Sequence, residues 1–430
     1  MPRPDLRARV ARRRAELEAA ERLRRLRVTT PLDGMQRGRD GVALTAFCDN
    51  DYLGLARHPK VVEAARRALD GAGFGGRSAH LIDGHHPLHD RLEEAFADWQ
   101  QRPRALLFGS GYLANLGVLQ ALLDRGDVCV QDKLNHACLL DGARLSGATL
   151  RRYPHADVDA AARQLLADPD APALLATDGV FSMDGDLAPL PALVDLTARE
   201  QALLYVDDAH GGGVLGPQGR GTAAAAGLDP AAVPLQLFTL GKAFGSYGGV
   251  VVGEADLVDA LVQRARSYLF TTALPPACAA AALAALDIVR SDEGEALRAR
   301  LQQHIQQFRR GLAARGLPDS GSATAIQPIL LGSDARTVAA AQALARLGVL
   351  VVAIRPPTVP EGACRLRITL SAAHTPVQIE HLLDALVAVL NSEAQHAAAM
   401  DSAEPCAKRE GTVGKRTDGA EIHGTDADVD

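Results

Sequence analysis

The chain has 430 residues, of which 47% are hydrophobic, 23% charged and 4% aromatic, and its formal net charge is −6. This composition excludes a disordered, collagen-like or fibrous protein, and the negative net charge argues against nucleic acid as a partner. Apolar stretches such as Ala277–Leu286 are too short to span a membrane, and no signal-like apolar segment follows the arginine-rich start. The six cysteines form no C-x-x-C pair, so we expect reduced thiols and a cytoplasmic protein.

Four segments are expected along the chain. Arginines and glutamates interleave at helical spacing near the start of residues 1–43, which predicts an N-terminal helical segment. Residues 44–290 alternate short apolar strands with helical patterns, which predicts a large α/β domain on a mostly parallel sheet flanked by helices. Residues 291–394 predict a smaller α+β domain. Residues 395–430 lack aromatic side chains, which predicts a disordered tail.

Apolar runs and helical periodicity locate the individual elements. The strands expected in the large domain are Ala105–Phe108, Asp127–Gln131, Ala173–Asp178, Leu203–Asp207, Leu235–Leu240 and Val250–Gly253. Its clearest helices are Pro59–Asp70, Leu88–Gln100 and Ala114–Leu123. The smaller domain is expected to contain a helix at Glu293–Arg315 and strands at Ile326–Leu331, Val349–Ile354 and Cys364–Thr369. Ligands of parallel sheets bind beyond the carboxyl ends of the strands, so candidate site residues are sought there.

Lysine is scarce in this chain, which makes Lys242 conspicuous. Lys and Arg together number 46, and the lysines are those at positions 60, 133, 242, 408 and 415. A primary amine can lose its proton and form a Schiff base, whereas a guanidinium stays charged. Lys242 follows the strand Leu235–Leu240 within a glycine-rich, apolar sequence. A solvated surface charge remains the alternative until a chemical partner is found.

A carboxylate at a neighbouring strand end supplies such a partner. The strand Leu203–Asp207 ends at Asp207, and Asp208 and His210 follow it. Carboxylates at this position can cap a helix, bind a metal or pair with the protonated ring nitrogen of pyridoxal phosphate. Further metal ligands are not evident at this edge of the sheet. The combination of Asp207 with Lys242, some 35 residues further on, therefore favours pyridoxal phosphate.

A glycine-rich turn indicates where a phosphate could bind. In Phe108–Asn115 a strand turns through glycines into a helix, whose free N–H groups could hold a phosphate, although a plain turn is the alternative. The segment Gly71–Gly76 matches G-x-G-x-x-G but follows a helix rather than a strand, which disfavours an NAD-dependent oxidoreductase. Gly241-Lys242 lacks the first glycine and the hydroxyl residue of a P-loop.

A histidine cluster precedes the helix Leu88–Gln100. His85, His86 and His89 stand at helix-turn spacing and could in principle bind a metal ion. Because they lie at a predicted helix entry, capping or ligand contact is favoured, and no metal is expected.

Taken together, these motifs resemble the α-oxoamine synthases, pyridoxal-phosphate enzymes of the aspartate-aminotransferase fold (fold type I). The similarity covers roughly residues 20–390. The blocks that carry it are Asn50–Gly54, Ser110–Asn115, Leu134–Ala137, Gly179–Asp186, Val206–Gly211, Thr239–Lys242 and Ile354–Pro360. The last block, followed by Arg365–Arg367, favours the branch of the family that acts in biotin biosynthesis.

The resemblance implies catalytic roles for four residues. Lys242 would hold pyridoxal phosphate as a Schiff base and act as the base. Asp207 would pair with the ring nitrogen, and His136 would stack on the ring. His210 would contact the phenolic oxygen of the ring and its surroundings.

The resemblance also implies further binding residues and a homodimer with shared sites. Around the ring oxygen and the phosphate it places Ser182, Gly111, Tyr112 and Thr239, joined by Thr271 and Thr272 from the neighbouring subunit. Arg367 would bind the amino-acid carboxylate, because guanidinium geometry suits a bidentate pair. Arg24 and Thr358 would lie near the substrate.

The implied reaction joins L-alanine to a pimeloyl thioester, carried on acyl-carrier protein or coenzyme A, with loss of CO2. Glycine-using members, such as glycine C-acetyltransferase (2-amino-3-ketobutyrate ligase) or 5-aminolevulinate synthase, share the cofactor residues and stay the main alternative. A non-catalytic relative that only binds a partner is disfavoured, because Lys242 and Asp207 are both present.

Overall fold

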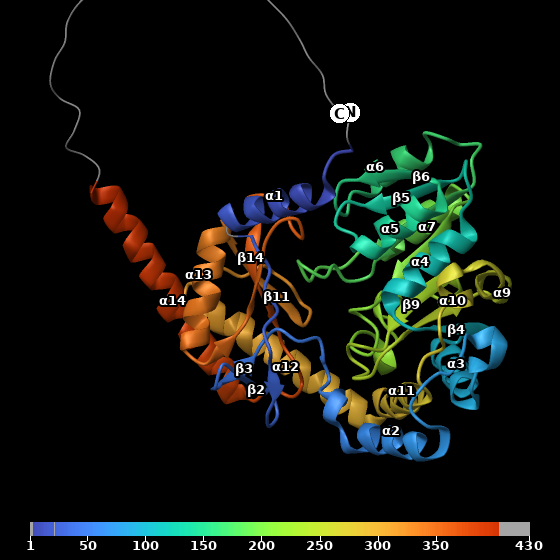
Figure 1. The fold of residues 1–430 in the computed structure, drawn as a ribbon, viewed down its shortest axis with the longest axis horizontal. Coiled ribbons are helices and arrows are strands. Elements are labelled where there is room, and N and C mark those ends of the chain that lie inside the picture. Colours follow the sequence, from blue (N-terminus) through green and yellow to red (C-terminus); the bar gives the residue numbers. More distant parts are fainter. Residues whose placement is uncertain (1–2, 21, 404–430) are drawn as a thin grey trace, which may run out of the picture.

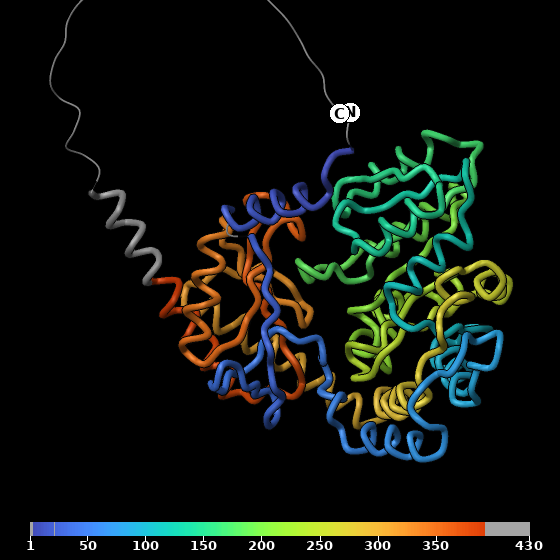
Figure 2. Tube along the Cα trace, viewed as in Figure 1, coloured from blue at the N-terminus to red at the C-terminus, as the bar shows by residue number. Residues whose placement is uncertain are grey.

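In this computed structural model, which describes residues 3–20 and 22–403, a large sheet domain lies beside a smaller α+β domain (Figure 1). The tube view shows that the N-terminal residues run along the smaller domain and then cross to the larger one (Figure 2). Helices α2 (Pro59–Ala72) and α11 (Pro276–Val289) pack together at the foot of the large domain. Helix α12 (Asp292–Ala314) follows α11 and leads into the smaller domain.

The large domain is built on a seven-stranded sheet of order β4-β10-β9-β8-β7-β5-β6. The strands are β4 (Arg104–Phe108), β5 (Val128–Asp132), β6 (Thr149–Tyr153), β7 (Ala173–Asp178), β8 (Leu203–Asp207), β9 (Leu235–Thr239) and β10 (Gly249–Gly253). Neighbours from β9 to β6 pair in parallel, whereas β10 is antiparallel to both β4 and β9. Strand β10 reverses because residues 240–248 are too few for a parallel crossover, which takes about a dozen. The predicted α/β fold class is confirmed.

Helices cover both faces of this sheet, which is why its central strands are apolar throughout. Along β7, Leu174 and Ala176 belong to the cluster under α4, and Leu175 faces α6 and α7, as the two-residue period of a strand requires. The helices of this domain are α3 (Pro87–Gln100), α4 (Gly111–Leu122), α5 (Ala137–Ser146), α6 (Val158–Leu165), α7 (Leu190–Arg199), α8 (Thr222–Ala225), α9 (Ala255–Arg264) and α10 (Arg266–Leu269). Short helical turns occur at η1 (Leu55–Arg57), η2 (His80–Gly84), η3 (Pro217–Gly219) and η4 (Pro230–Ala232).

Strand β6 was not expected from the sequence. It lies at the edge of the sheet and pairs only with β5 among the described strands. Its sequence contains Arg151 and Arg152, which interrupt the apolar run that marks a buried strand. Charged residues are common on edge strands, where they discourage pairing with other chains.

The smaller domain contains a three-stranded antiparallel sheet of order β11-β14-β13. Its elements are β11 (Ile326–Gly332), α13 (Asp334–Arg346), β13 (Val352–Ile354), β14 (Cys364–Thr369) and α14 (Pro376–Ala403). A second sheet joins the N-terminal segment to the smaller domain, because β12 pairs in parallel with β3. Its strands are β1 (Thr30–Pro31), β2 (Gln36–Arg39), β3 (Val42–Ala46) and β12 (Val349–Leu350).

The structure corrects several expected boundaries. In the segment 1–43 only α1 (Leu6–Ala19) is a long helix, and the rest of its regular structure consists of β1, β2 and the start of β3. The expected strand Val349–Ile354 divides after Leu350, because its two halves pair with different sheets. The expected disordered tail 395–430 begins inside α14, which continues to Ala403, and residues 404–430 lie outside the described residues. Among the described residues, no helix has the length and apolarity that a membrane crossing requires.

Replacing Leu366 with Ala tests the core of the smaller domain. Leu366 lies on β14 with its side chain fully buried, so the substitution should lower the free energy of unfolding by about 2–5 kcal/mol. Leu330→Ala is the matched control, because Leu330 lies on the adjacent strand β11 and is 53% exposed. Urea denaturation should show a large change only for Leu366→Ala, and equal changes would contradict the assigned register.

Candidate active site

A cavity of about 260 Å³ opens at the carboxyl ends of the central strands. The residues that line it come from the turns after β4, β5, β7, β8 and β9. Those singled out in the sequence are Gly111, Tyr112, His136, Ser182, Asp207, His210, Thr239 and Lys242. The strand-end rule therefore brings together residues that lie up to 131 positions apart in the chain, from Gly111 to Lys242.

Lys242 lies in the short connection between β9 and β10 and points into the cavity. Its Nζ atom is 2.8 Å from Nε2 of His210. Burial lowers the pKa of the Lys242 amine to about 8, and the negative charges of Asp207 and Asp178 oppose a larger shift. An amine with this pKa is partly unprotonated near neutral pH and can act as a nucleophile or a base.

A chain of hydrogen bonds fixes the tautomer of His210. Burial and the charge of Lys242 lower the pKa of His210 well below its usual range, so the imidazole is neutral. Its Nδ1 atom is 2.6 Å from the hydroxyl of Tyr52, which in turn donates to Oδ1 of Asn50 at 3.1 Å. Because the hydroxyl of Tyr52 donates its proton to Asn50, Nδ1 of His210 donates to the Tyr52 oxygen. Its Nε2 atom then accepts from Lys242. His210 is thereby oriented to accept a hydrogen bond from Lys242.

Asp207 is buried, and both of its carboxylate oxygens have partners. Oδ1 accepts from the backbone N–H of Ala209 at 3.0 Å, and Oδ2 accepts from the amide of Asn115 at 2.6 Å. The hydroxyl of Tyr205 donates to Asn115 at 2.7 Å and so holds the amide in this orientation. On the adjacent strand, burial and the charge of Asp207 raise the pKa of Asp178 well above its usual range. Neighbouring Asp208 points away from the cavity and accepts from Thr222 and Gln236, which is a structural role.

His136 lies across the cavity at the N-terminus of α5. Its backbone N–H donates to Asp178 at 3.0 Å, and its Nδ1 atom is 2.7 Å from Sγ of Cys138. Burial lowers the pKa of His136, which keeps the ring neutral. A neutral, flat ring at this position can pack against a planar ligand.

The N-terminus of α4 forms one end of the cavity. Ser110 caps the helix by accepting from the N–H of Leu113 at 3.2 Å. The preceding N–H groups of Gly111 and Tyr112 have no acceptor among the described residues, so they are available to an anion. Gly249 on β10 packs so closely that a Cβ atom there would lie 2.8 Å from the Gly111 nitrogen.

Arg367 lies beside the cavity rather than in its lining. Its Nε atom donates to the carbonyl of Ser182 at 2.6 Å, and its Nη atoms lie 3.3 Å from Oδ1 of Asn50. It is buried on β14, so the smaller domain contributes a positive charge next to the sheet edge.

The structure does not bring the remaining candidates into this cavity. Thr271 and Thr272 follow α10 on a partly exposed loop, and Arg24 and Thr358 are exposed. None of these four side chains lines the cavity within the described chain.

Sequence reasoning gave no role to several residues around the cavity: Tyr52, Asn115, Cys138 and Asp178. Tyr52 and Asn115 stand inside the blocks Asn50–Gly54 and Ser110–Asn115, which was the available signal. Asp178 ends a predicted strand, the same signal that identified Asp207. Cys138 carried no signal in the sequence.

The histidine cluster caps a helix, as the sequence suggested. The side chain of His86 accepts from Leu88, and Nδ1 of His89 accepts from the N–H of His86, which together form a capping box at the start of α3. Ligand atoms of His80, His85 and His89 lie within 4.8 Å of one another. However, Nε2 of His89 is 2.7 Å from the carbonyl of Leu274, so both nitrogens of His89 are engaged.

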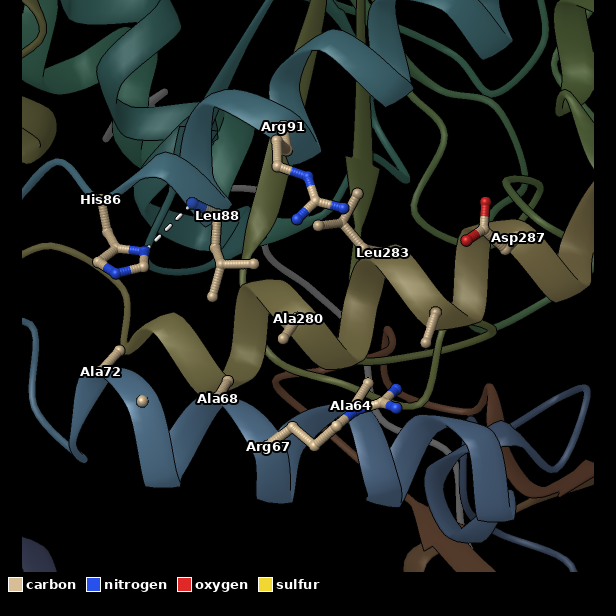
Figure 3. A pocket seen from close by; sticks show the side chains of 12 residues that line it. Ala64, Arg67, Ala68, Ala72, His86, Leu88, Arg91, Ala280, Leu283 and Asp287 are labelled. Atoms are coloured by element: carbon tan, nitrogen blue, oxygen red, sulfur yellow. Dashed lines mark hydrogen bonds between the residues drawn. The ribbon is translucent and has the colours of Figure 1, made fainter.

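A second cavity of about 550 Å³ lies between α2, α3 and α11 (Figure 3). Small side chains such as Ala68 and Ala280 line it where α2 meets α11, and Arg67 and Arg91 lie on opposite sides. It contains none of the candidate catalytic residues.

Comparisons with known proteins agree on one family. The family model for class I and II aminotransferases matches residues 43–386. The 8-amino-7-oxononanoate synthase of Xanthomonas euvesicatoria pv. vesicatoria is 55% identical over 90% of this chain and 96% of its own. That of Xanthomonas oryzae pv. oryzae is 54% identical over the same shares.

Two solved structures have the same fold. A serine palmitoyltransferase from S. paucimobilis, solved with PLP and myriocin bound, is 28% identical with a TM-score of 0.85, covering 90% of this chain and 99% of its own. The 8-amino-7-oxononanoate synthase from Francisella tularensis is 32% identical with a TM-score of 0.70, covering 82% of this chain and 99% of its own.

The lowered pKa of Lys242 can be tested directly with a small aldehyde and a reducing agent that traps the adduct. In protein stripped of bound small molecules, labelling of Lys242 should rise about tenfold per pH unit and level off above about pH 8, because only the unprotonated amine reacts. Mass spectrometry of the labelled peptide gives the rate, and Lys242→Ala is the control. A rise that continues to about pH 10.4, as for an ordinary lysine, would contradict the assigned environment.

Proposed function

The chain belongs to the class I and II aminotransferases and, among them, to the 8-amino-7-oxononanoate synthases, and we propose that its cavity joins L-alanine to a pimeloyl thioester. The protein is a pyridoxal-phosphate-dependent acyltransferase of biotin biosynthesis, and its products are 8-amino-7-oxononanoate, CO2 and the free thiol carrier. The observation that carries the proposal is the buried amine of Lys242 in one cavity with Asp207 and the open N-terminus of α4.

The cavity has the features that this cofactor requires. A phosphate needs N–H donors, and those of Gly111 and Tyr112 are free at the start of a 12-residue helix. An aldehyde needs a nucleophilic amine, and Lys242 has a pKa of about 8. A protonated ring nitrogen needs a carboxylate, and Asp207 is buried in the cavity wall.

Each lining residue that was singled out in the sequence is assigned a contact with the cofactor. Lys242 would hold it covalently through Nζ, Asp207 would pair with the ring nitrogen, and His136 would pack on the ring. The contacts to the ring oxygen and the phosphate fall to Ser182, His210, Gly111, Tyr112 and Thr239.

When bound, pyridoxal phosphate supplies an electron sink for the carbanion that forms at the amino-acid Cα. The amine of Lys242, released when the amino group of L-alanine takes its place, would remove the Cα proton, a task that suits an amine with a pKa of about 8. His210 accepts a hydrogen bond from Lys242 and so holds the amine toward the cavity.

Arg367 is assigned to the carboxylate of L-alanine. Its guanidinium is already oriented by Ser182 and Asn50, so its fork is fixed before the substrate arrives. Arg24 and Thr358 are assigned to the surroundings of the substrate. Acyl-carrier protein and coenzyme A remain the two carriers to be compared.

The exposed loop after α10 supports a homodimer with shared sites. Thr271 and Thr272 are assigned to the phosphate bound by the partner subunit. The loop is held by a hydrogen bond from the N–H of Ala273 to the carbonyl of Ser78. Large apolar side chains stand exposed around these two segments, with Phe74 79%, Ile82 81% and Phe270 72% exposed, which is typical of a surface that another subunit covers.

Thiol release tests the reaction. Purified protein should release thiol from pimeloyl-coenzyme A or pimeloyl-acyl-carrier protein with L-alanine, and Lys242→Ala should abolish this release together with the visible absorbance of the bound cofactor. Glycine with acetyl-coenzyme A and L-serine with palmitoyl-coenzyme A are the discriminating controls. Faster turnover with either control pair would refute the assigned substrates, and an unchanged spectrum in Lys242→Ala would refute the anchor.

Mixed dimers test the shared sites. Lys242→Ala and the double variant Thr271→Ala/Thr272→Ala should each be inactive, yet after subunit exchange the mixed dimers regain one intact site. Because half of the dimers are then mixed and each has one good site, about a quarter of the wild-type activity should return. Exchange is verified by mass spectrometry of differently tagged subunits. Exchanged dimers without activity would contradict a site built from two subunits.

A further inference from the structure

His155 lies outside the cavity but connects two segments that line it. Its Nδ1 atom is 3.1 and 3.2 Å from the two carboxylate oxygens of Asp132, at the end of β5. Its Nε2 atom is 2.6 Å from Oδ2 of Asp186, in the loop after β7. The ring of Phe181 packs edge-on against the imidazole, with ring centroids 4.4 Å apart. The histidine is therefore held in place from three directions.

The hydrogen bonds define the charge of this histidine. Ionised carboxylates only accept hydrogen bonds, so both ring nitrogens of His155 must carry a proton. The two carboxylates raise the pKa of His155 to about 10, which is consistent with an imidazolium at neutral pH. Asp132 is 1% exposed and also accepts from the N–H groups of Leu134 and Ala156. A cation between the two acids is what allows them to lie this close together.

Each of these carboxylates is four residues away from a residue of the cavity wall. Asp132 precedes His136, and the connecting turn is held by Asp132 through Leu134. Asp186 follows Ser182, and the loop between them closes by hydrogen bonds from Phe181 to Asp186 and from Gly185 to Phe181. His155 thus sets the spacing between the turn that carries His136 and the loop that carries Ser182.

The smaller domain holds the same loop from the other side. The carbonyl of Ser182 accepts from Arg367, Asp184 pairs with Arg365, and the carbonyl of Gly185 accepts from Thr324 at 2.9 Å. Without His155, the loop Ser182–Asp186 would be tied to the smaller domain more firmly than to the turn that carries His136.

We propose that His155 is a positioning residue for the reaction, which as an imidazolium between Asp132 and Asp186 keeps Ser182 and His136 on facing walls of the cofactor cavity. The inference rests on the proposed function for the identity of the bound cofactor. Its effect reaches the reacting atoms only through the two loops, since His155 does not line the cavity.

The test compares His155→Phe, which removes both hydrogen bonds, with His155→Gln, whose amide retains one donor group. For His155→Phe, kcat/KM for L-alanine should fall about ten- to hundredfold, because small displacements of positioning groups have effects of this size. The dissociation constant of pyridoxal phosphate, measured by fluorescence on the apoprotein, should rise, and the visible band of the holoprotein should shift. His155→Gln should recover part of each loss. Asp186→Asn, which keeps the loop but removes one charge, should behave like His155→Gln.

His58→Gln is the matched control. His58 also pairs with a carboxylate, that of Glu293 at 3.0 Å, and its side chain is 20% exposed against 29% for His155. It lies at the start of α2, outside the cavity lining, so this variant should lower the melting temperature without changing KM or the spectrum. If His155→Phe behaves in the same way, His155 is merely structural and the proposal is wrong.

Two further outcomes separate this inference from the proposed function. If His155→Phe does not fold, the same measurements are made on Asp186→Asn. If the affinity of Asp186→Asn for pyridoxal phosphate and its KM for L-alanine equal those of the wild type, the proposal is wrong. If the wild-type protein releases no thiol with L-alanine, the proposed function fails. Weaker cofactor binding in His155→Gln would then still support the positioning role, because that readout needs no substrate.

Discussion

The burial of a single amine is the constraint on which the site depends. An ammonium ion removed from water is destabilised by several kcal/mol unless opposite charges lie close by. Around Lys242 the compensating charges come from Asp207 and Asp178, whereas Arg367 adds a second positive charge to the same region. The result is an amine that is neither permanently charged nor permanently neutral. This balance requires the carboxyl ends of β7, β8 and β9 to lie at one edge of the sheet. They do so because the three strands pair in parallel.

The same edge explains why the two acids have different environments. Asp207 has a donor on each oxygen, from Ala209 and from Asn115, which stabilises its negative charge. Among the described residues, the carboxylate of Asp178 has one hydrogen-bond donor, the N–H of His136, and Asp178 lies opposite Asp207 in the strand register. Burial and the charge of Asp207 raise the pKa of Asp178 well above its usual range, so Asp178 binds a proton more readily than an ordinary carboxyl group does. Under the proposed function, the ring nitrogen of the cofactor would pair with Asp207, the carboxylate that has a donor on each oxygen.

Much of the site could be read from the sequence because its residues follow strands. Lys242, Asp207 and Asp178 each end or follow an apolar run, and in a parallel sheet this position alone places them together. The scarcity of lysine helped further. The fold class was accessible for the same reason, since alternating strands and helices leave few other arrangements.

The features that escaped the sequence depend on contacts between distant segments. The division of Val349–Ile354 at Val351 arises because β12 pairs with β3 and β13 with β14, and neither partner is visible locally. Strand β6 was not predicted from the sequence, because an edge strand does not need an apolar run. Asn115 and Tyr52 act through Asp207 and His210, more than 90 positions away in the chain. Their amide and hydroxyl acquire a role only when tertiary packing supplies the partner.

The loop Ser182–Asp186 shows how the two domains share one site. Four groups of this loop accept hydrogen bonds from Arg365, Arg367, Ser322 and Thr324 of the smaller domain: the carbonyls of Ser182, Met183 and Gly185 and the carboxylate of Asp184. A substrate carboxylate on Arg367 would compete with the carbonyl of Ser182 and the amide oxygen of Asn50 for the same guanidinium. Substrate binding would then change a hydrogen bond of Ser182 in the cavity wall directly. It would also change the hydrogen bonds that lead through Asn50, Tyr52 and His210 to Lys242. Lys242, the proposed base, and Arg367, the proposed binding residue for the substrate carboxylate, are therefore joined by one continuous set of hydrogen bonds.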